Sequence, residues 1–180
     1  METKPIFTVD LEDWNHALHQ VKRGHSSIQS VWWLIARLDQ SKVKAIFYVL
    51  GRFREEFSGM IERIESSGHI LGDHGFFHDH GESQQYPRVN PNYRSPYWDT
   101  DPMPWPPSGG FFFRFMPYWY VKWAVKKSGV FWIHPHDLDE GHPRLKNPLL
   151  NWKRHVGLKG ARKKLERLLK EVEFGDPSKN

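Results

Sequence analysis

Acidic and imidazole side chains follow three apolar runs of this chain, at the points where β-strands are expected to end. Asp10 and Glu12 follow the first run, His74 follows the second, and His134 follows the third. Catalytic groups of barrel enzymes lie at the carboxyl ends of their strands rather than in mid-strand. Side chains placed in this way indicate an active site to which several strands contribute.

Two histidines four residues apart, His74 and His78, can direct both rings to one point on a helix or in a tight loop. The carboxylates of Asp10, Glu12 and Asp13 repel one another, and a divalent cation or a nearby arginine would offset that repulsion. These imidazole and carboxylate groups suit one divalent metal with an open position. The pattern favours metal-assisted hydrolysis, although a helix-capping Asp and two surface histidines would also explain it.

Two further residues have side chains suited to this chemistry. Arg94 precedes Ser-Pro and can pair with a carboxylate through two hydrogen bonds, which would orient Asp10; a surface loop arginine is the alternative. His134 is placed to act as a general acid or base, or else as a buried histidine bonded to a backbone carbonyl. The neighbouring His136 and Asp137 could tune His134 or cap a helix.

The elements that would position these groups follow from hydrophobic periodicity. Strands are predicted over Ile6–Val9, Lys44–Leu50, Ile70–Leu71, Gly109–Phe113 and Gly129–Ile133. Helices are predicted over Ser27–Asp39, Arg54–Ser67, Pro117–Lys127 and Leu158–Val172. The β-α-β-α-β order of the first half favours an α/β fold with a parallel sheet or barrel.

Composition and charge exclude several classes of protein. The chain has 180 residues, 38% of them hydrophobic, which suits one folded domain over residues 1–180. It has no cysteine, so a metal must be held by His, Asp or Glu. No apolar stretch approaches the roughly 18 residues of a membrane span, and no signal peptide is evident, so we expect a cytoplasmic protein.

The net charge of +5 comes largely from the basic segment Lys153–Lys170. A solvated helix face explains it, and no recognisable nucleic-acid-binding module accompanies it. The stretch 79–107 is rich in proline and polar residues and is predicted to form loops.

The segments, in this order, resemble the polysaccharide deacetylases of carbohydrate esterase family 4, which share the NodB-homology fold. The pattern is most similar to the branch associated with exopolysaccharide biosynthesis. The motifs that carry the resemblance are Val9–Trp14, Lys44–Gly51, Gly68–His78, Tyr93–Pro96, Ser108–Trp119 and His134–Asp139.

The resemblance implies a distorted, incomplete (β/α) barrel and the metal-dependent removal of an N-acetyl or other N-acyl group from an amino sugar. Asp10 matches the catalytic base of the family, and His134 matches its catalytic acid. Arg94 matches the arginine that orients the base. The backbone N–H of Tyr97 matches an oxyanion donor, and Trp14 is expected to take part in substrate binding.

The resemblance also implies a ligand set. His74 and His78 match the metal histidines, while the carboxylate ligand is Glu12 or, in reserve, Asp13. Zinc is the expected metal, with cobalt, iron and nickel as alternatives. The Asp that usually tunes the acid histidine has no direct counterpart, and the candidates for that role are Asp99, Asp101 and Asp137.

Two internal stretches are shorter than in relatives, which suits a small substrate such as a nucleotide- or lipid-linked sugar in surface polysaccharide or O-antigen biosynthesis. Two rivals keep the same ligands: a degenerate, non-catalytic member that binds metal or glycan, and a non-haem iron oxygenase. A glycan- or nucleic-acid-binding module built on the basic C-terminal helix, residues 158–173, is a third.

Overall fold

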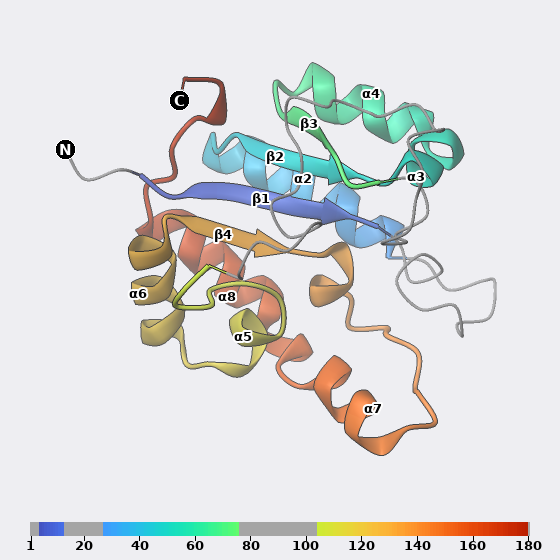
Figure 1. The fold of residues 1–180 in the computed structure, drawn as a ribbon, viewed down its shortest axis with the longest axis vertical. Helices are drawn as coiled ribbons and strands as arrows, with labels where there is room; N and C mark the ends of the chain where they lie inside the picture. Colours follow the sequence, from blue (N-terminus) through green and yellow to red (C-terminus); the bar gives the residue numbers. More distant parts are fainter. Residues whose placement is uncertain (1–3, 13–26, 76–103, 180) are drawn as a thin grey trace.

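A four-stranded parallel sheet forms the centre of the protein in this computed structural model, which describes residues 4–12, 27–75 and 104–179. The strands are β1 (Ile6–Leu11), β2 (Ala45–Val49), β3 (Ile70–Asp73) and β4 (Val130–Ile133), in the spatial order β3-β2-β1-β4. All three pairings are parallel, so the carboxyl ends of the strands lie at one edge, where the arrowheads point in Figure 1. The predicted α/β class with a parallel sheet is confirmed.

The register of the sheet determines which residues are neighbours at that edge. Val9 of β1 lies opposite Ile133 of β4. The residues that come next along the chain, Asp10 and His134, are therefore neighbours. On the other side of β1, Leu11 is aligned with Val49 of β2, which is itself aligned with Asp73 of β3. The groups predicted to do chemistry therefore leave their strands at the same level.

Helices pack around this sheet, as Figure 1 shows. Helices α2 and α8 contact each other, α4 lies against β3, and α6 lies against β4. The helices are α2 (Ile28–Ser41), α3 (Gly51–Glu56), α4 (Ser58–Ser66), α5 (Gly110–Phe115), α6 (Tyr118–Ser128), α7 (Pro148–His155) and α8 (Leu158–Glu171), with the 3₁₀ turns η1 (Pro135–Leu138) and η2 (Pro177–Lys179).

Aromatic side chains join the sheet to its surroundings. Phe131 of β4 is fully buried and meets Phe7 of β1 edge to face, with ring centroids 5.1 Å apart. Phe113 of α5 packs on Phe131 at 5.3 Å, and Phe174 packs on Phe7 at 5.4 Å. Edge-to-face pairs of this kind are favourable beyond the area that they bury. The core thus continues from the first strand to the end of the chain.

The predicted strand at 109–113 is wrong, because this segment begins helix α5. Gly109 and Gly110 let the start of the helix press against Trp132 of β4. A Cβ atom on Gly109 would lie 1.9 Å from the Trp132 carbonyl oxygen, and Gly110 has a φ of +51°. Phenylalanine favours strands on average, but burial of Phe113 in the core overrides that preference here.

Two other helical predictions need correction. The single helix predicted over 54–67 is two helices, α3 and α4, which meet at Phe57 with a φ of −132°. Helix α7 was not predicted, although Pro148 stands at its start and the Asn147 side chain accepts a hydrogen bond from Leu150 N at 3.0 Å. Both are typical signals of a helix N-terminus.

The basic C-terminal segment is only partly a solvated face. The ammonium of Lys164 donates to the carbonyl oxygens of Phe113, Arg114 and Met116 at 2.8–3.1 Å. These carbonyls end helix α5, where a cation is favourable. Arg162 similarly reaches the Leu138 carbonyl at 3.0 Å. Two of the charges therefore hold the fold together, which the sequence pattern did not indicate.

Among the described residues, every helix is too short or too polar to cross a membrane.

Candidate active site

The carboxyl edge of the sheet brings together three of the predicted side chains. His134 Nε2 lies 3.8 Å from Asp10 Oδ2 and 3.6 Å from Glu12 Oε1. Asp10 and Glu12 are 4% and 3% exposed, so both carboxyl groups are held out of bulk water. One imidazole nitrogen thus faces two buried carboxyl groups, an arrangement suited to proton transfer.

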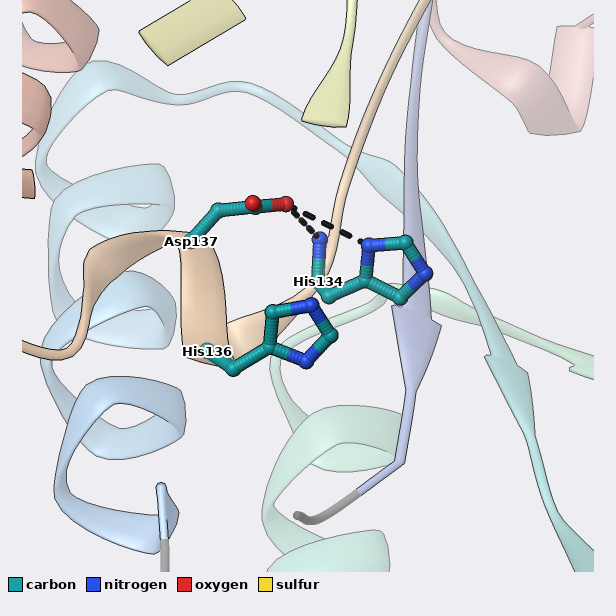
Figure 2. A group of neighbouring side chains, drawn as sticks. All are labelled: His134, His136 and Asp137. Atoms are coloured by element: carbon teal, nitrogen blue, oxygen red, sulfur yellow. Dashed lines mark hydrogen bonds and ion pairs between the residues drawn. The ribbon is translucent and has the colours of Figure 1, made fainter. Parts of the chain in front are cut away.

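The other side of the His134 ring is held by Asp137, as Figure 2 shows. Asp137 Oδ2 accepts a hydrogen bond from the His134 backbone N–H at 2.9 Å and lies 3.3 Å from His134 Nδ1. A carboxylate beside Nδ1 favours a hydrogen on that nitrogen and leaves Nε2 directed at Asp10 and Glu12. Of the three acids considered for tuning His134, Asp137 is the one that the described structure places in contact with it.

Arg114 binds the carboxylate oxygen of Asp137 that does not contact His134. Its Nε donates to Asp137 Oδ1 at 2.8 Å, and both groups are almost fully buried. The remaining guanidinium nitrogens donate to the carbonyl oxygens of Lys153, Arg154 and Val156 at 2.8–3.1 Å. Arg114 was not predicted from the sequence, although a single charged residue within Phe-Phe-Phe-Arg-Phe indicates that the charge needs a buried partner.

These contacts shift the pKa of His134. Burial alone would lower that pKa, but the hydrogen bond to Asp137 and the negative charges of Glu12, Asp137 and Asp10 together raise it to about 9. Burial alone would raise the pKa of Asp137. The hydrogen bond from His134 and the nearby positive charges outweigh burial and hold that pKa far below its usual value. At neutral pH the pair is therefore an imidazolium beside a carboxylate.

The pKa values of Asp10 and Glu12, on the opposite side of the His134 ring, are both raised. Burial raises the pKa of Asp10 to about 6, against the lowering effect of His134. Burial, with the charge of Asp10, raises the pKa of Glu12 to about 7, again against His134. Asp10 Oδ1 is buried and has no hydrogen-bond partner among the described residues. A buried oxygen of this kind beside a second carboxyl group fits a site for a cation.

His74 lies on the far side of β2 from this pair. It is 4% exposed, it follows β3 directly, and its N–H donates to the Val49 carbonyl at 3.2 Å. Glu12 and His74 each stand one residue beyond the aligned positions Leu11 and Asp73. Two strand spacings separate their backbones, roughly 10 Å, which a Glu and a His side chain can span together through a metal ion.

A second group of possible ligands is His134, His136 and Asp137, whose donor atoms lie within 4.8 Å of one another (Figure 2). The rings of the two histidines stack, with centroids 4.5 Å apart. Two guanidinium groups already contact this group: Arg114 bonds Asp137, and Arg154 Nη1 lies 3.0 Å from His136 Nε2. Because both are cations, they disfavour a metal ion here.

The remaining predicted site residues, Asp13, Trp14, His78, Arg94 and Tyr97, lie outside the described residues, as do the alternatives Asp99 and Asp101.

Comparison with known proteins divides the chain in two. Residues 28–96 match the model of the polysaccharide deacetylase family, and residues 97–179 match a domain of unknown function, DUF3473. Peptidoglycan-N-acetylglucosamine deacetylase of Bacillus cereus is 38% identical over 45 residues, which are 25% of this chain and 16% of that protein. The chain thus matches only a small part of the length of this curated relative.

The structural matches concern the fold. A mutant of a Bacillus anthracis CE4 family pseudoenzyme, described as having restored enzymatic activity, superposes with a TM-score of 0.54 at 11% identity. The match covers 99% of this chain and 68% of that one. A second mutant of the same pseudoenzyme gives a TM-score of 0.50 at 10% identity, with the same coverage.

The fold of these structures agrees with the parallel sheet described above. Its parallel strands and surrounding helices form an α/β structure of the (β/α) barrel type, and the four described strands form an open part of such a barrel. Residues 28–96, which carry strands β2 and β3, match the polysaccharide deacetylase family, and the order of the motifs along the chain resembles that family.

Proposed function

We propose that the protein is a metal-dependent hydrolase that removes an N-acetyl or other N-acyl group from an amino sugar. The observation that carries the proposal is the position of His134 Nε2, 3.6–3.8 Å from the carboxyl groups of Glu12 and Asp10 at the carboxyl edge of the sheet. A proton donor and a proton acceptor held side by side out of bulk water suit amide hydrolysis.

In this proposal Glu12 and His74 hold the metal, with His78 and, in reserve, Asp13 from the sequence pattern. Zinc is the expected ion, and cobalt, iron or nickel would suit the same ligands. A bound divalent metal polarises an amide oxygen and lowers the pKa of its water from about 15.7 toward about 7. Both carboxyl groups are buried, and Asp10 Oδ1 has no hydrogen-bond partner among the described residues, which supports binding of such an ion.

The chain's own residues then move the protons. Asp10, with a pKa of about 6, accepts a proton from the attacking water at neutral pH. His134, with a pKa of about 9, carries the proton that the leaving amine requires. Asp137 keeps Nδ1 engaged, so that the proton is delivered from Nε2. The two groups thus begin in opposite protonation states, as a base and an acid must.

Three residues from the sequence pattern complete the proposed site. Arg94 orients Asp10, the backbone N–H of Tyr97 stabilises the oxyanion by a few kcal/mol, and Trp14 contacts the sugar. The substrate class that we favour is an N-acylated sugar or sugar precursor of surface polysaccharide biosynthesis.

The proposal is tested by metal content and turnover together. Wild-type protein and the double variant His74→Ala, His78→Ala are assayed for bound zinc, cobalt, iron and nickel, and for acetate released from N-acetylated sugars. We expect about one metal per chain in the wild type and loss of both metal and turnover in the double variant. His80→Ala, a histidine to which no role is assigned, is the control.

Asp10→Asn separates an enzyme from a degenerate binding member of the family. A catalytic base contributes roughly 10²–10⁴-fold to rate, so turnover should fall by that factor while metal content stays near one per chain. Metal binding with no acetate release by the wild type from any N-acetylated sugar would favour the non-catalytic alternative. No metal in the wild type, even after addition of zinc, would overturn the proposed ligand set.

A further inference from the structure

A pocket of about 220 Å³ lies beside His134, on the side away from the carboxyl groups of Asp10 and Glu12. Its floor includes His134, His136 and Asp137, whereas Asp10 and Glu12 do not line it. His134 therefore stands between the proposed reaction centre and a separate hollow. A substrate whose leaving amine is protonated by His134 would place a neighbouring substituent at this pocket.

The walls of the pocket are cationic. Arg114, Lys153 and Arg154 line it, and among the described residues Asp137 is the one carboxylate that does. Arg114 and Asp137 form a buried ion pair at 2.8 Å and offset each other. Lys153 and Arg154 therefore leave the described lining with a net positive charge. A concave surface with this balance attracts an anion.

The two cations present different chemistry. Lys153 is exposed at the rim, and no ion pair of its ammonium is found within the described residues; it lies 5.9 Å from the centre of the Phe111 ring. Arg154 is half-buried next to His136, and this burial lowers its pKa. Because a desolvated guanidinium gains more from an anion than a hydrated one does, Arg154 is suited to direct contact with phosphate or carboxylate oxygens.

The rest of the lining is apolar and aromatic. Phe111, Trp132 and Leu150 border the pocket, and Phe111 stacks on Phe115 with centroids 5.3 Å apart and planes 13° apart. Trp152 packs edge-on against both phenylalanines and is 48% exposed. An apolar wall beside a few charged groups is typical of small-molecule sites, and flat aromatic faces suit the apolar side of a sugar ring.

We propose that this pocket binds an anionic substituent of the substrate, a phosphate or a carboxylate, held by Lys153 and Arg154 next to the amine that His134 protonates. The inference rests on the proposed function for its orientation, and it narrows the substrate to acidic N-acylated sugars. The same cations would disfavour sugars that carry a positively charged substituent at this position.

The test measures binding directly. N-acetylglucosamine 1-phosphate, the 2-acetamido uronic acid of glucose and neutral N-acetylglucosamine are each titrated calorimetrically into wild-type protein. We expect at least one of the two anionic sugars to bind about tenfold or more tightly than the neutral one, and to lose that preference at high salt. The phosphate and carboxylate arms show which anion the pocket accepts.

Matched variants locate the effect. Lys153→Gln should weaken binding of the preferred anionic sugar about fivefold, and Lys153→Glu should weaken it further, with little effect on the neutral sugar. Lys159→Gln, the same change at an exposed lysine of α8 outside the pocket, should change neither. Lys153 is at the surface, so its variants are expected to fold.

The outcomes separate this inference from the proposed function. Equal affinity for charged and neutral sugars, or equal losses in Lys153→Gln and Lys159→Gln, would overturn the anion pocket, even in a protein that releases acetate. If an anionic sugar binds preferentially through Lys153 but releases no acetate, the result would support the anion pocket and contradict the proposed hydrolysis.

Discussion

His134 lies between carboxyl groups that act on different sides of one ring. Asp137 contacts its Nδ1 and its backbone N–H, while Asp10 and Glu12 face its Nε2. Asp137 comes from the turn that follows His134, three residues along the chain, rather than from a separate strand. His134 therefore carries its Nδ1 partner on its own segment, whereas Arg114, which binds Asp137, comes from helix α5.

Replacement of Asp137 by Asn tests this arrangement. Without the carboxylate, the pKa of His134 should fall from about 9 toward 6.5, because the largest influence that raises it is lost. The alkaline limb of the pH–rate profile should move to lower pH, and an NMR titration of the His134 ring should report the same change without requiring turnover. Stability should fall by about 3 kcal/mol, because Arg114 loses its buried partner.

Glu140→Gln is the matched control, since it removes an exposed carboxylate three residues away. It should leave the titration of His134 and the unfolding free energy unchanged. An unshifted His134 titration in Asp137→Asn would contradict the role that we assign to Asp137.

His69 gives the protein a pH-dependent stability that is independent of the site. It is 5% exposed, and burial with the charges of Lys44 and Arg63 lowers its pKa to about 4, against the opposite effect of Asp39. The unfolded chain, with a pKa of 6.5, therefore binds this proton first as the pH falls. Stability is intact above pH 6.5 and is lost between there and about pH 4, with about 2 kcal/mol lost by pH 5.

His69→Asn tests this effect, because an Asn oxygen can replace Nδ1 as the acceptor for Ala45 N–H and does not titrate. Urea unfolding at pH 7 and pH 5 should show a pH dependence about 2 kcal/mol smaller in the variant than in the wild type. Equal pH dependence in the two proteins would mean that other groups, such as His142, whose pKa is also lowered to about 4, carry it.

Residue types and spacing were enough to place Asp10, Glu12, His74 and His134 at one edge of the sheet, where the first three are buried and His134 is partly buried. Those predictions depend on where a strand ends, which hydrophobic patterning reveals. Arg114 could not be assigned in the same way, because its partner lies 23 residues further along the chain. Whether an isolated charge becomes buried and which acid it meets are decided by tertiary packing.

At the scale of elements, two cations tie three helices together. Lys164 of α8 binds the carbonyls that end α5, and Arg114 of α5 binds carbonyls at the end of α7. Helix ends leave carbonyls without intrahelical partners, so each cation satisfies groups that would otherwise need water. Helix α5 is therefore held by α8 through Lys164 and by α7 through Arg114, in addition to the ion pair between Arg114 and Asp137.

Gly157, between α7 and α8, allows this close approach. Its φ is +75°, and a Cβ atom there would lie 2.2 Å from the Arg114 carbonyl oxygen. Gly157→Ala should cost about 1 kcal/mol for the left-handed backbone and a further 1–3 kcal/mol for the displaced Arg114 segment. Chemical denaturation gives the unfolding free energy that checks this value.

Gly129→Ala is the control for that substitution. Gly129 has the same φ of +75°, but a Cβ atom there meets nothing within 4 Å. It should show the backbone cost alone, so the difference between the two variants isolates the contact with Arg114. Equal losses of stability would refute the close approach.

Elements with regular patterns were predicted well, and those decided by contacts were not. Helix α2, helix α8 and strand β2 follow clear periodicity and lie within two residues of their predicted bounds. The segment 109–113, predicted as a strand, instead begins helix α5. Its conformation follows instead from Gly109 and Gly110 against Trp132, a contact between segments that local sequence does not contain.

At the scale of the whole molecule, the sheet crosses the boundary between the two matched regions. Strands β2 and β3 lie in the part that matches the polysaccharide deacetylase family, and β4 lies in the part that matches the domain of unknown function. Strand β1 pairs with both β2 and β4. We therefore propose that residues 1–180 form one cooperative domain, with His134 delivered to the site by the second region.

Phe131→Ala tests that cooperativity. Phe131 is fully buried in β4 between Phe7 and Phe113, so its truncation should cost about 3–5 kcal/mol. If the chain unfolds as one unit, native-state hydrogen exchange should show the slowest amides of β2 losing as much protection as those of β4, because both exchange through the same global opening. Phe115→Ala, at a residue that is 49% exposed, should change neither set appreciably.

Loss of protection confined to β4 would mean that the second region unfolds separately, and that the position of His134 opposite Asp10 depends on docking between two units. Because the proposed acid and the proposed base would then belong to different units, such a result would also predict that turnover is lost at lower denaturant concentration than the structure of β2.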